Sequence, residues 1–159
     1  MDSAKVAPGR LIVVGVDGSH HGDAALRWTL KYIALPADTV HAMMARPART
    51  LLPGTSYAFQ PHSRQPEGMY SPHAHIARIR AEFPAAPEIT VTTPEGDAAN
   101  VLVASSADAD LLVVGSHGSG RATDFLMGSV SRECVRNARC PVVVITPEAA
   151  HRLVPEPSS

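Results

Sequence analysis

The chain has 159 residues, of which 45% are hydrophobic and 18% charged, and its formal net charge is −1. This composition fits one globular domain, and a near-neutral charge with few aromatic residues argues against a nucleic-acid-binding surface. No apolar run reaches the ~18 residues that a membrane span needs, so we expect no membrane insertion. The first residues lack a secretory signal, and Cys134 and Cys140 have neither zinc nor disulfide-scaffold spacing, which favours a cytoplasmic protein.

Five short, apolar, β-rich segments alternate with helical patterns along the chain. The first, fourth and fifth are apolar almost throughout, which is typical of strands covered on both faces. Alternating strands and helices predict a parallel α/β sheet with right-handed crossovers. The expected strands are residues 11–16, 39–44, 88–93, 111–114 and 141–146, and the expected helices are 19–34, 73–83, 98–107 and 129–138.

Three segments do not follow this rhythm. Residues 46–72 are rich in Pro, Gly, Ser and Arg and have no periodicity, so we expect a long surface loop. Residues 1–10 and 147–159 are expected to be flexible tails. The domain itself is therefore expected to span residues 11–146.

Glycine-bearing junctions follow two of the strands, at residues 15–19 and 115–121, and a third opens the last helix at 128–131. Gly115, Gly118 and Gly120 lack side chains, so backbone N–H groups there can approach an anion closely. Gly128 and Ser129 lie at a helix N-terminus, where free N–H groups and the helix dipole favour phosphate.

Each piece alone also fits a structural role. A glycine after a strand is often only a turn residue, and Ser129 is equally consistent with a helix cap. The combination favours a phosphate site, to which the hydroxyls of Ser129 and Ser131 and the loop arginine Arg121 can contribute. Asp17 fits a turn or a ribose contact, His117 fits a ligand contact or simple exposure, and the remaining histidines are expected to be solvated. No metal site is expected.

Other nucleotide and catalytic motifs are absent. The chain contains no GxxxxGK[ST] loop, and its Gly118-x-Gly120 is followed by Thr123 where a GxGxxG motif needs glycine. A GxSxG nucleophile elbow is also missing. These absences argue against a Walker-type ATPase, a Rossmann dehydrogenase and a serine hydrolase.

The segment 111–145 resembles the signature end of the universal stress protein family. Its pattern is a glycine, two residues, a glycine, nine residues and then Gly-Ser, which Gly115, Gly118, Gly128 and Ser129 satisfy. The first strand with Asp17 and the pair His41-Ala42 resemble that family too. The resemblance implies a Rossmann-like, five-stranded parallel sheet ordered 3-2-1-4-5, with a ligand crevice where the strand order reverses.

The resemblance also implies roles for individual residues in binding ATP, or ADP or AMP, with Mg²⁺ held by the phosphates. Asp17 is expected at the ribose or adenine, and Ala42 at the adenine, mainly through its backbone. The remaining expected contacts are Gly15 and Val16 at the base, Gly115, His117 and Gly118 at the ribose and phosphates, and Gly128, Ser129, Val130 and Ser131 at the phosphates.

Three functions stay open at this point. The favoured one is an ATP-dependent sensor or regulator in a stress response, with slow or no hydrolysis, because no base or catalytic residue is evident. The others are a slow ATPase or phosphotransferase, and an adaptor with a vestigial site. The apolar run 142–145 is expected to be an edge strand that forms a homodimer. A regulatory protein partner is expected but not identified.

Overall fold

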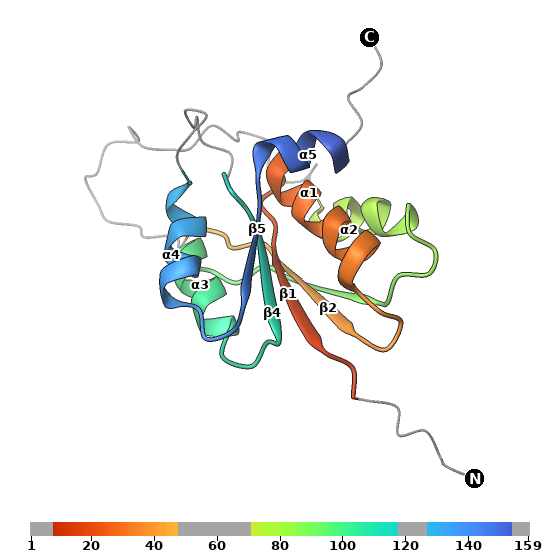
Figure 1. The fold of residues 1–159 in the computed structure, drawn as a ribbon, viewed down its shortest axis with the longest axis horizontal. Helices are drawn as coiled ribbons and strands as arrows, with labels where there is room; N and C mark the ends of the chain where they lie inside the picture. Colours follow the sequence, from red (N-terminus) through yellow and green to blue (C-terminus); the bar gives the residue numbers. More distant parts are fainter. Residues whose placement is uncertain (1–7, 48–70, 118–126, 154–159) are drawn as a thin grey trace.

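A computed structural model of the chain describes residues 8–47, 71–117 and 127–153. Its centre is a five-stranded parallel sheet in the order β3-β2-β1-β4-β5, which confirms the expected fold (Figure 1). Each strand lies within one or two residues of the predicted segment. The strands are β1 (Leu11–Gly15), β2 (Thr39–Met43), β3 (Ile89–Thr92), β4 (Leu111–Gly115) and β5 (Val142–Ile145).

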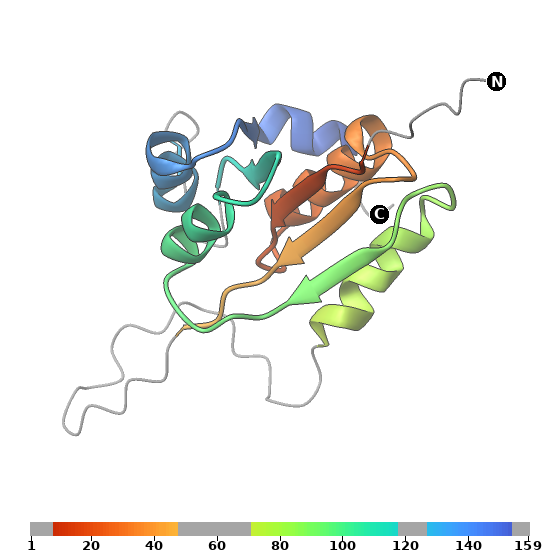
Figure 2. The same cartoon turned by 90° about the horizontal axis from the view of Figure 1, so that it is seen from below.

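Helices cover both faces of the sheet (Figure 2). One face packs under α1 (His20–Trp28), α2 (Pro72–Ala81) and α5 (Pro147–Leu153), and the other under α3 (Ala98–Ser105) and α4 (Ser129–Asn137). The two core clusters match these layers. Leu26, Ile76 and Ala150 are buried on the first face, and Leu102 and Cys134 on the second.

Strands β1 and β4 mark the point where the strand order reverses. They pair in parallel, with Val13 opposite Leu112. The chain leaves β1 toward α1 and β2 on one side, and leaves β4 toward α4 and β5 on the other. The helices that follow these two strands lie on opposite faces, so their connections separate beyond the carboxyl ends of the strands. Ligands of open α/β sheets bind at such a point.

Two predicted segments differ from the structure. The helical pattern 19–34 divides into α1 and a π-helical turn, Thr29–Ile33, which ends where the Ala34 N–H donates to the Thr29 carbonyl. Residues 147–153, expected to begin a flexible tail, form α5 instead, because the wholly buried Ala150 packs against the α1 side of the core. Within the expected 46–72 loop, Arg46 forms an isolated β-bridge with Glu95 and Pro72 begins α2, while residues 48–70 lie outside the described part.

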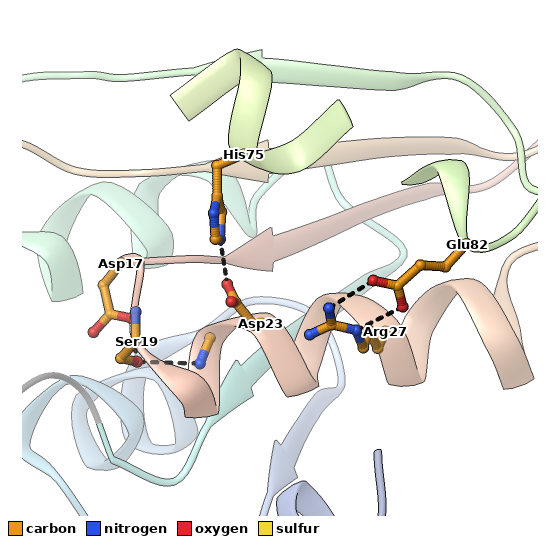
Figure 3. Close-up of polar contacts among 7 residues, drawn as sticks. Asp17, Ser19, Asp23, Arg27, His75 and Glu82 are labelled. Carbon is orange, nitrogen blue, oxygen red and sulfur yellow. Dashed lines mark hydrogen bonds and ion pairs between the residues drawn. The ribbon is translucent and has the colours of Figure 1, made fainter. Parts of the chain in front are cut away.

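Helices α1 and α2 are joined by two side-chain contacts (Figure 3). The guanidinium of Arg27 donates to both carboxylate oxygens of Glu82, at 2.7 and 2.9 Å. One turn closer to the start of α1, His75 Nε2 lies 2.7 Å from Asp23 Oδ1. These contacts fix how α2 lies across α1, and so hold the start of α1 in place beside the carboxyl end of β1.

A second ion pair fixes the entrance to β1. Asp38 is almost fully buried and accepts hydrogen bonds from the backbone of Arg10 and Leu35 as well as from the Arg10 guanidinium, whose Nη2 is 2.6 Å away. The Arg10 hydrogen bond is the main reason why the pKa of Asp38 falls to about 2. The carboxylate therefore joins the start of β1 to the turn before β2.

We expect Asp38→Asn to lower the free energy of unfolding by about 1–3 kcal/mol at pH 7, because a charge-assisted contact is lost inside the protein. A lowered carboxyl pKa gives stability that is present above the ordinary value of 3.8 and is lost as the pH falls toward about 2. The difference between wild type and variant should therefore shrink over this range, as measured by urea unfolding.

Glu148→Gln is the matched control, since the Arg152–Glu148 pair is 77% exposed on both sides and contributes little. A wild-type advantage over Asp38→Asn that persisted unchanged at pH 2 would contradict this account of Asp38.

Candidate functional site

A cavity of about 470 Å³ lies at the carboxyl ends of the central strands. Strands β1, β2 and β4 and the first turns of α3 and α4 contribute its walls. Its position is the one that the strand order predicts. The lining residues are Gly15, Val16, Asp17, Gly22, Met43, Ala45, Ala98, Val101, Leu102, Val114, Gly115, His117, Gly128, Ser129, Val130 and Ser131.

The first junction is held by Asp17. Its Oδ1 accepts from the Ser19 backbone N–H at 2.9 Å and from the Ser19 hydroxyl, and Ser19 in turn caps α1 by accepting from the Gly22 N–H (Figure 3). A Cβ on Gly22 would lie 2.8 Å from Asp17 Oδ1, so the glycine lets the carboxylate reach this position. Asp17 thus serves the turn and also lines the cavity.

The junction after β4 is fixed by the backbone of Ser116. Its N–H donates to the Ile145 carbonyl at 2.8 Å, and its own carbonyl accepts from the Gly128 N–H at 2.7 Å. The Ser131 hydroxyl donates to the same carbonyl at 2.9 Å and lies 3.1 Å from the Gly128 carbonyl. Because its one proton is used in this way, the Ser131 side chain positions α4 rather than offering a donor to the cavity.

Helix α4 begins at the cavity without a side-chain cap. Its N-cap is Gly128, whereas Ser19, Ser71 and Asp97 cap the three preceding α-helices with their side chains. The first backbone donor within the helix is Arg132, which donates to the Gly128 carbonyl. The N–H groups of Ser129, Val130 and Ser131 have no acceptor among the described residues. They supply three donors, with the positive end of the helix dipole, at the cavity wall.

His117 lies on the same wall and is 9% exposed. Its Nδ1 is 2.9 Å from the Ser116 hydroxyl, which fixes the ring orientation. Gly115, two residues before His117, allows α1 to approach β4. A Cβ at position 115 would lie 2.8–2.9 Å from the Cβ, carbonyl carbon and carbonyl oxygen of His21.

The structure brings most of the predicted site residues together. Those at the cavity are Gly15, Val16, Asp17, Gly115, His117, Gly128, Ser129, Val130 and Ser131. Gly118, Gly120 and Arg121 lie outside the described residues. Ala42 is fully buried in the core on the α1 side and does not line the cavity.

Sequence reasoning missed the wall formed by β2 and α3. Met43 and Ala45 line the cavity, whereas the Ala42 side chain points into the core on the other face of the sheet, because successive strand side chains alternate between faces. The expected backbone contact of Ala42 with the base stays a prediction. Ala98, Val101 and Leu102 complete an apolar wall from α3. The available signal was the helical spacing of these three residues, which indicated a buried face but not which space it bordered. The described residues contain no group of three side chains placed to hold a metal ion.

The fold and cavity define an open, parallel α/β protein in which an uncapped helix N-terminus borders a cavity at the point where the strand order reverses. Residues 10–146 match the model of the universal stress protein family. Universal stress protein Rv2623 of Mycobacterium tuberculosis is 38% identical over 146 residues, which are 86% of this chain and 48% of that protein. The chain belongs to the universal stress protein family, and it spans about half the length of the curated relatives it matches.

Two solved structures share the fold. A universal stress protein in complex with cAMP has a TM-score of 0.56 and 24% identity, covering 88% of this chain and 98% of that one. An Arabidopsis thaliana universal stress protein family member with AMP bound has a TM-score of 0.56 and 22% identity, covering 86% and 90%. No helix in the described part is long and apolar enough to cross a membrane.

We expect Gly115→Ala to destabilise the fold by ~1–3 kcal/mol, because the added methyl meets the backbone of α1, which cannot move independently. Gly15→Ala is the comparison: there the closest atom is Leu102 Cδ1 at 2.9 Å, the end of a side chain that can rotate. Its loss should be smaller. Urea unfolding of both variants tests this, and equal losses would show that contact with α1 does not restrict position 115.

Proposed function

We propose that this chain binds an adenine nucleotide in the cavity, with the phosphates at the start of α4. The observation that carries the proposal is the N-terminus of α4, where Gly128 leaves the helix uncapped and three backbone donors border the cavity. A phosphate group satisfies several such donors at once and interacts favourably with the helix dipole. Backbone donors also explain how an anion can be held where no described lysine or arginine lines the cavity.

The other walls suit the rest of a nucleotide. Met43, Val101 and Leu102 offer an apolar surface for the base. Asp17 lies at the end of β1, where a carboxylate can accept from ribose hydroxyls. The volume falls in the range of small-molecule sites, which is about 300–1,000 Å³. The cAMP and AMP complexes of two structures with the same fold support this choice of ligand class.

Within this class we propose ATP as the ligand, with Mg²⁺ coordinated by phosphate oxygens and water. The glycine pattern ending at Gly128 and Ser129 supports the choice. Phosphate oxygens and water are the ligands that Mg²⁺ prefers at nucleotide sites.

We further propose that the protein acts as a nucleotide-dependent regulator in the stress response that names its family. Asp17 is the one carboxylate among the described lining residues, and its Oδ1 already holds the turn to α1. Such a site can bind phosphates, but its described residues include no second carboxylate that could act as a base and activate a water molecule for hydrolysis. The presence of bound nucleotide, rather than its hydrolysis, would then change which contacts the protein makes with a partner. The edge strand β5 is the surface that we propose for a homodimer.

Ser129→Pro tests whether the backbone N–H groups at the start of α4 bind the phosphates. Proline is well tolerated at the first helical position, and the extended backbone of Gly128 (φ −61°, ψ 163°) suits the residue before it. The variant should fold normally but lose one backbone donor. We expect ATP affinity, measured by titration calorimetry, to fall by about 10–100-fold, which corresponds to a hydrogen bond to a charged group.

Ser129→Ala is the matched control, because it removes the hydroxyl and keeps the N–H group. It should change affinity by only a few fold. Thermal unfolding of both variants establishes that the fold is intact. If ATP, ADP and AMP gave no binding heat and no thermal protection with the wild type, the proposed function would be wrong. Equal effects of the two substitutions would assign the contact to the side chain instead.

A further inference from the structure

Four histidines form a row that leads from α5 to the cavity. The ring centroids are 5.8 Å apart between His151 and His20, 5.9 Å between His20 and His21, and 5.6 Å between His21 and His117. His151 belongs to α5, His20 and His21 open α1, and His117 lines the cavity after β4. No local pattern in the sequence connects them, and His20 and His21 were expected to be solvated.

His21 occupies the critical position in this row. Its Nδ1 is buried and has no hydrogen-bond partner in the described part of the chain. Burial, followed by the neighbouring His117 and His20, lowers the pKa of His21. The charged groups that act on it come from every side: Asp17 from the β1–α1 turn, His20 from its own helix, His117 from the end of β4 and His151 from α5. Asp17 alone favours the protonated ring.

An anion in the cavity changes this balance. His117 shares the cavity wall with the first turn of α4, where the phosphates are proposed to bind. A nearby negative charge favours the protonated form of a histidine and so raises its pKa. A histidine that is neutral in the empty protein can then take up a proton as the ligand enters.

We propose that this row, principally His21, takes up a proton when a phosphate-bearing ligand binds, so that binding strengthens as the pH falls. The proposal rests on the proposed function, because it requires an anion at the start of α4. One proton is favoured over several, since two charged rings less than 6 Å apart repel each other. The row thereby makes occupancy of the site respond to pH.

The sign of the pH dependence follows from linkage. If the ligand raises the pKa of a histidine, the affinity for the ligand increases as the pH falls through the pKa of the ligand-bound protein. The increase in affinity is complete once the pH is below the histidine pKa of the ligand-free protein, which is the lower of the two. A rise of one unit corresponds to about tenfold in affinity.

Calorimetric titration of the full chain with AMP is the first test. Repeating it at pH 7 in buffers of different ionisation enthalpy counts the protons taken up. We expect net uptake by the wild type, and less uptake with a flatter pH profile for His21→Gln. The AMP phosphate itself titrates near pH ~6, but this contribution is common to all variants. His73→Gln, an exposed position on α2, is the matched control and should behave as the wild type does.

NMR titration of the histidine rings gives a second measurement that does not depend on mutating His21. In the wild type, the pKa of His21 should rise when AMP is added. In the free protein, His117→Gln should raise the pKa of His21 by removing a neighbouring charge.

The outcomes separate this inference from the proposed function. Binding of AMP with no proton uptake and unchanged histidine titration would overturn the row's role while leaving nucleotide binding intact. Absence of nucleotide binding at every pH would overturn both. Uptake that was equal in the wild type and His21→Gln, with ring titrations unmoved by AMP, would assign the proton to the ligand and overturn the inference.

Discussion

The site depends on the backbone of one residue, Ser116. Its carbonyl accepts from the Gly128 N–H and the Ser131 hydroxyl, while its N–H donates to the Ile145 carbonyl in β5. Three elements therefore meet at a single peptide: the end of β4, the end of β5 and the first turn of α4. Hydrogen bonds of this kind fix the direction of the helix before any ligand arrives. A preorganised terminus holds an anion without the cost of ordering a loop around it.

This construction also explains why the site needs so little side-chain chemistry. The donors of α4 are backbone N–H groups, which any residue except proline supplies. The sequence must instead leave these N–H groups unoccupied, which a glycine at the N-cap does and a capping serine or aspartate would not. It must also place small residues where two backbones come close together. Gly115 against His21 and Gly22 against Asp17 are two such approaches. Both glycines are therefore needed because there is no room for a side chain, and not because they take part in chemistry.

Local chemistry was enough to predict the strands and the two junctions. Segments 11–16 and 111–114 could be recognised because strands buried on both faces are apolar throughout. The β2 side chain that faces the cavity, Met43, could not be predicted, since only the three-dimensional sheet decides which face borders the cavity. Helix α5 was missed because seven residues are too few to form a stable helix alone. It is stabilised by the packing of Ala150 against the α1 side of the core, which the local sequence does not show. The histidine row joins positions from distant parts of the chain, so no local pattern marks it.

All described walls of the cavity come from one chain of a length that is about half that of its curated relatives. The ends of β4 and β5 belong to the same parallel sheet, and α3 and α4 pack on one of its faces, so the described walls form within this one fold. The proposed binding site lies at the switch point between β1 and β4, whereas β5 pairs with β4 and α5 packs against α1. Two contacts link the cavity to these elements: the Ser116 N–H donates to the Ile145 carbonyl in β5, and the row of histidines ends at His151 in α5.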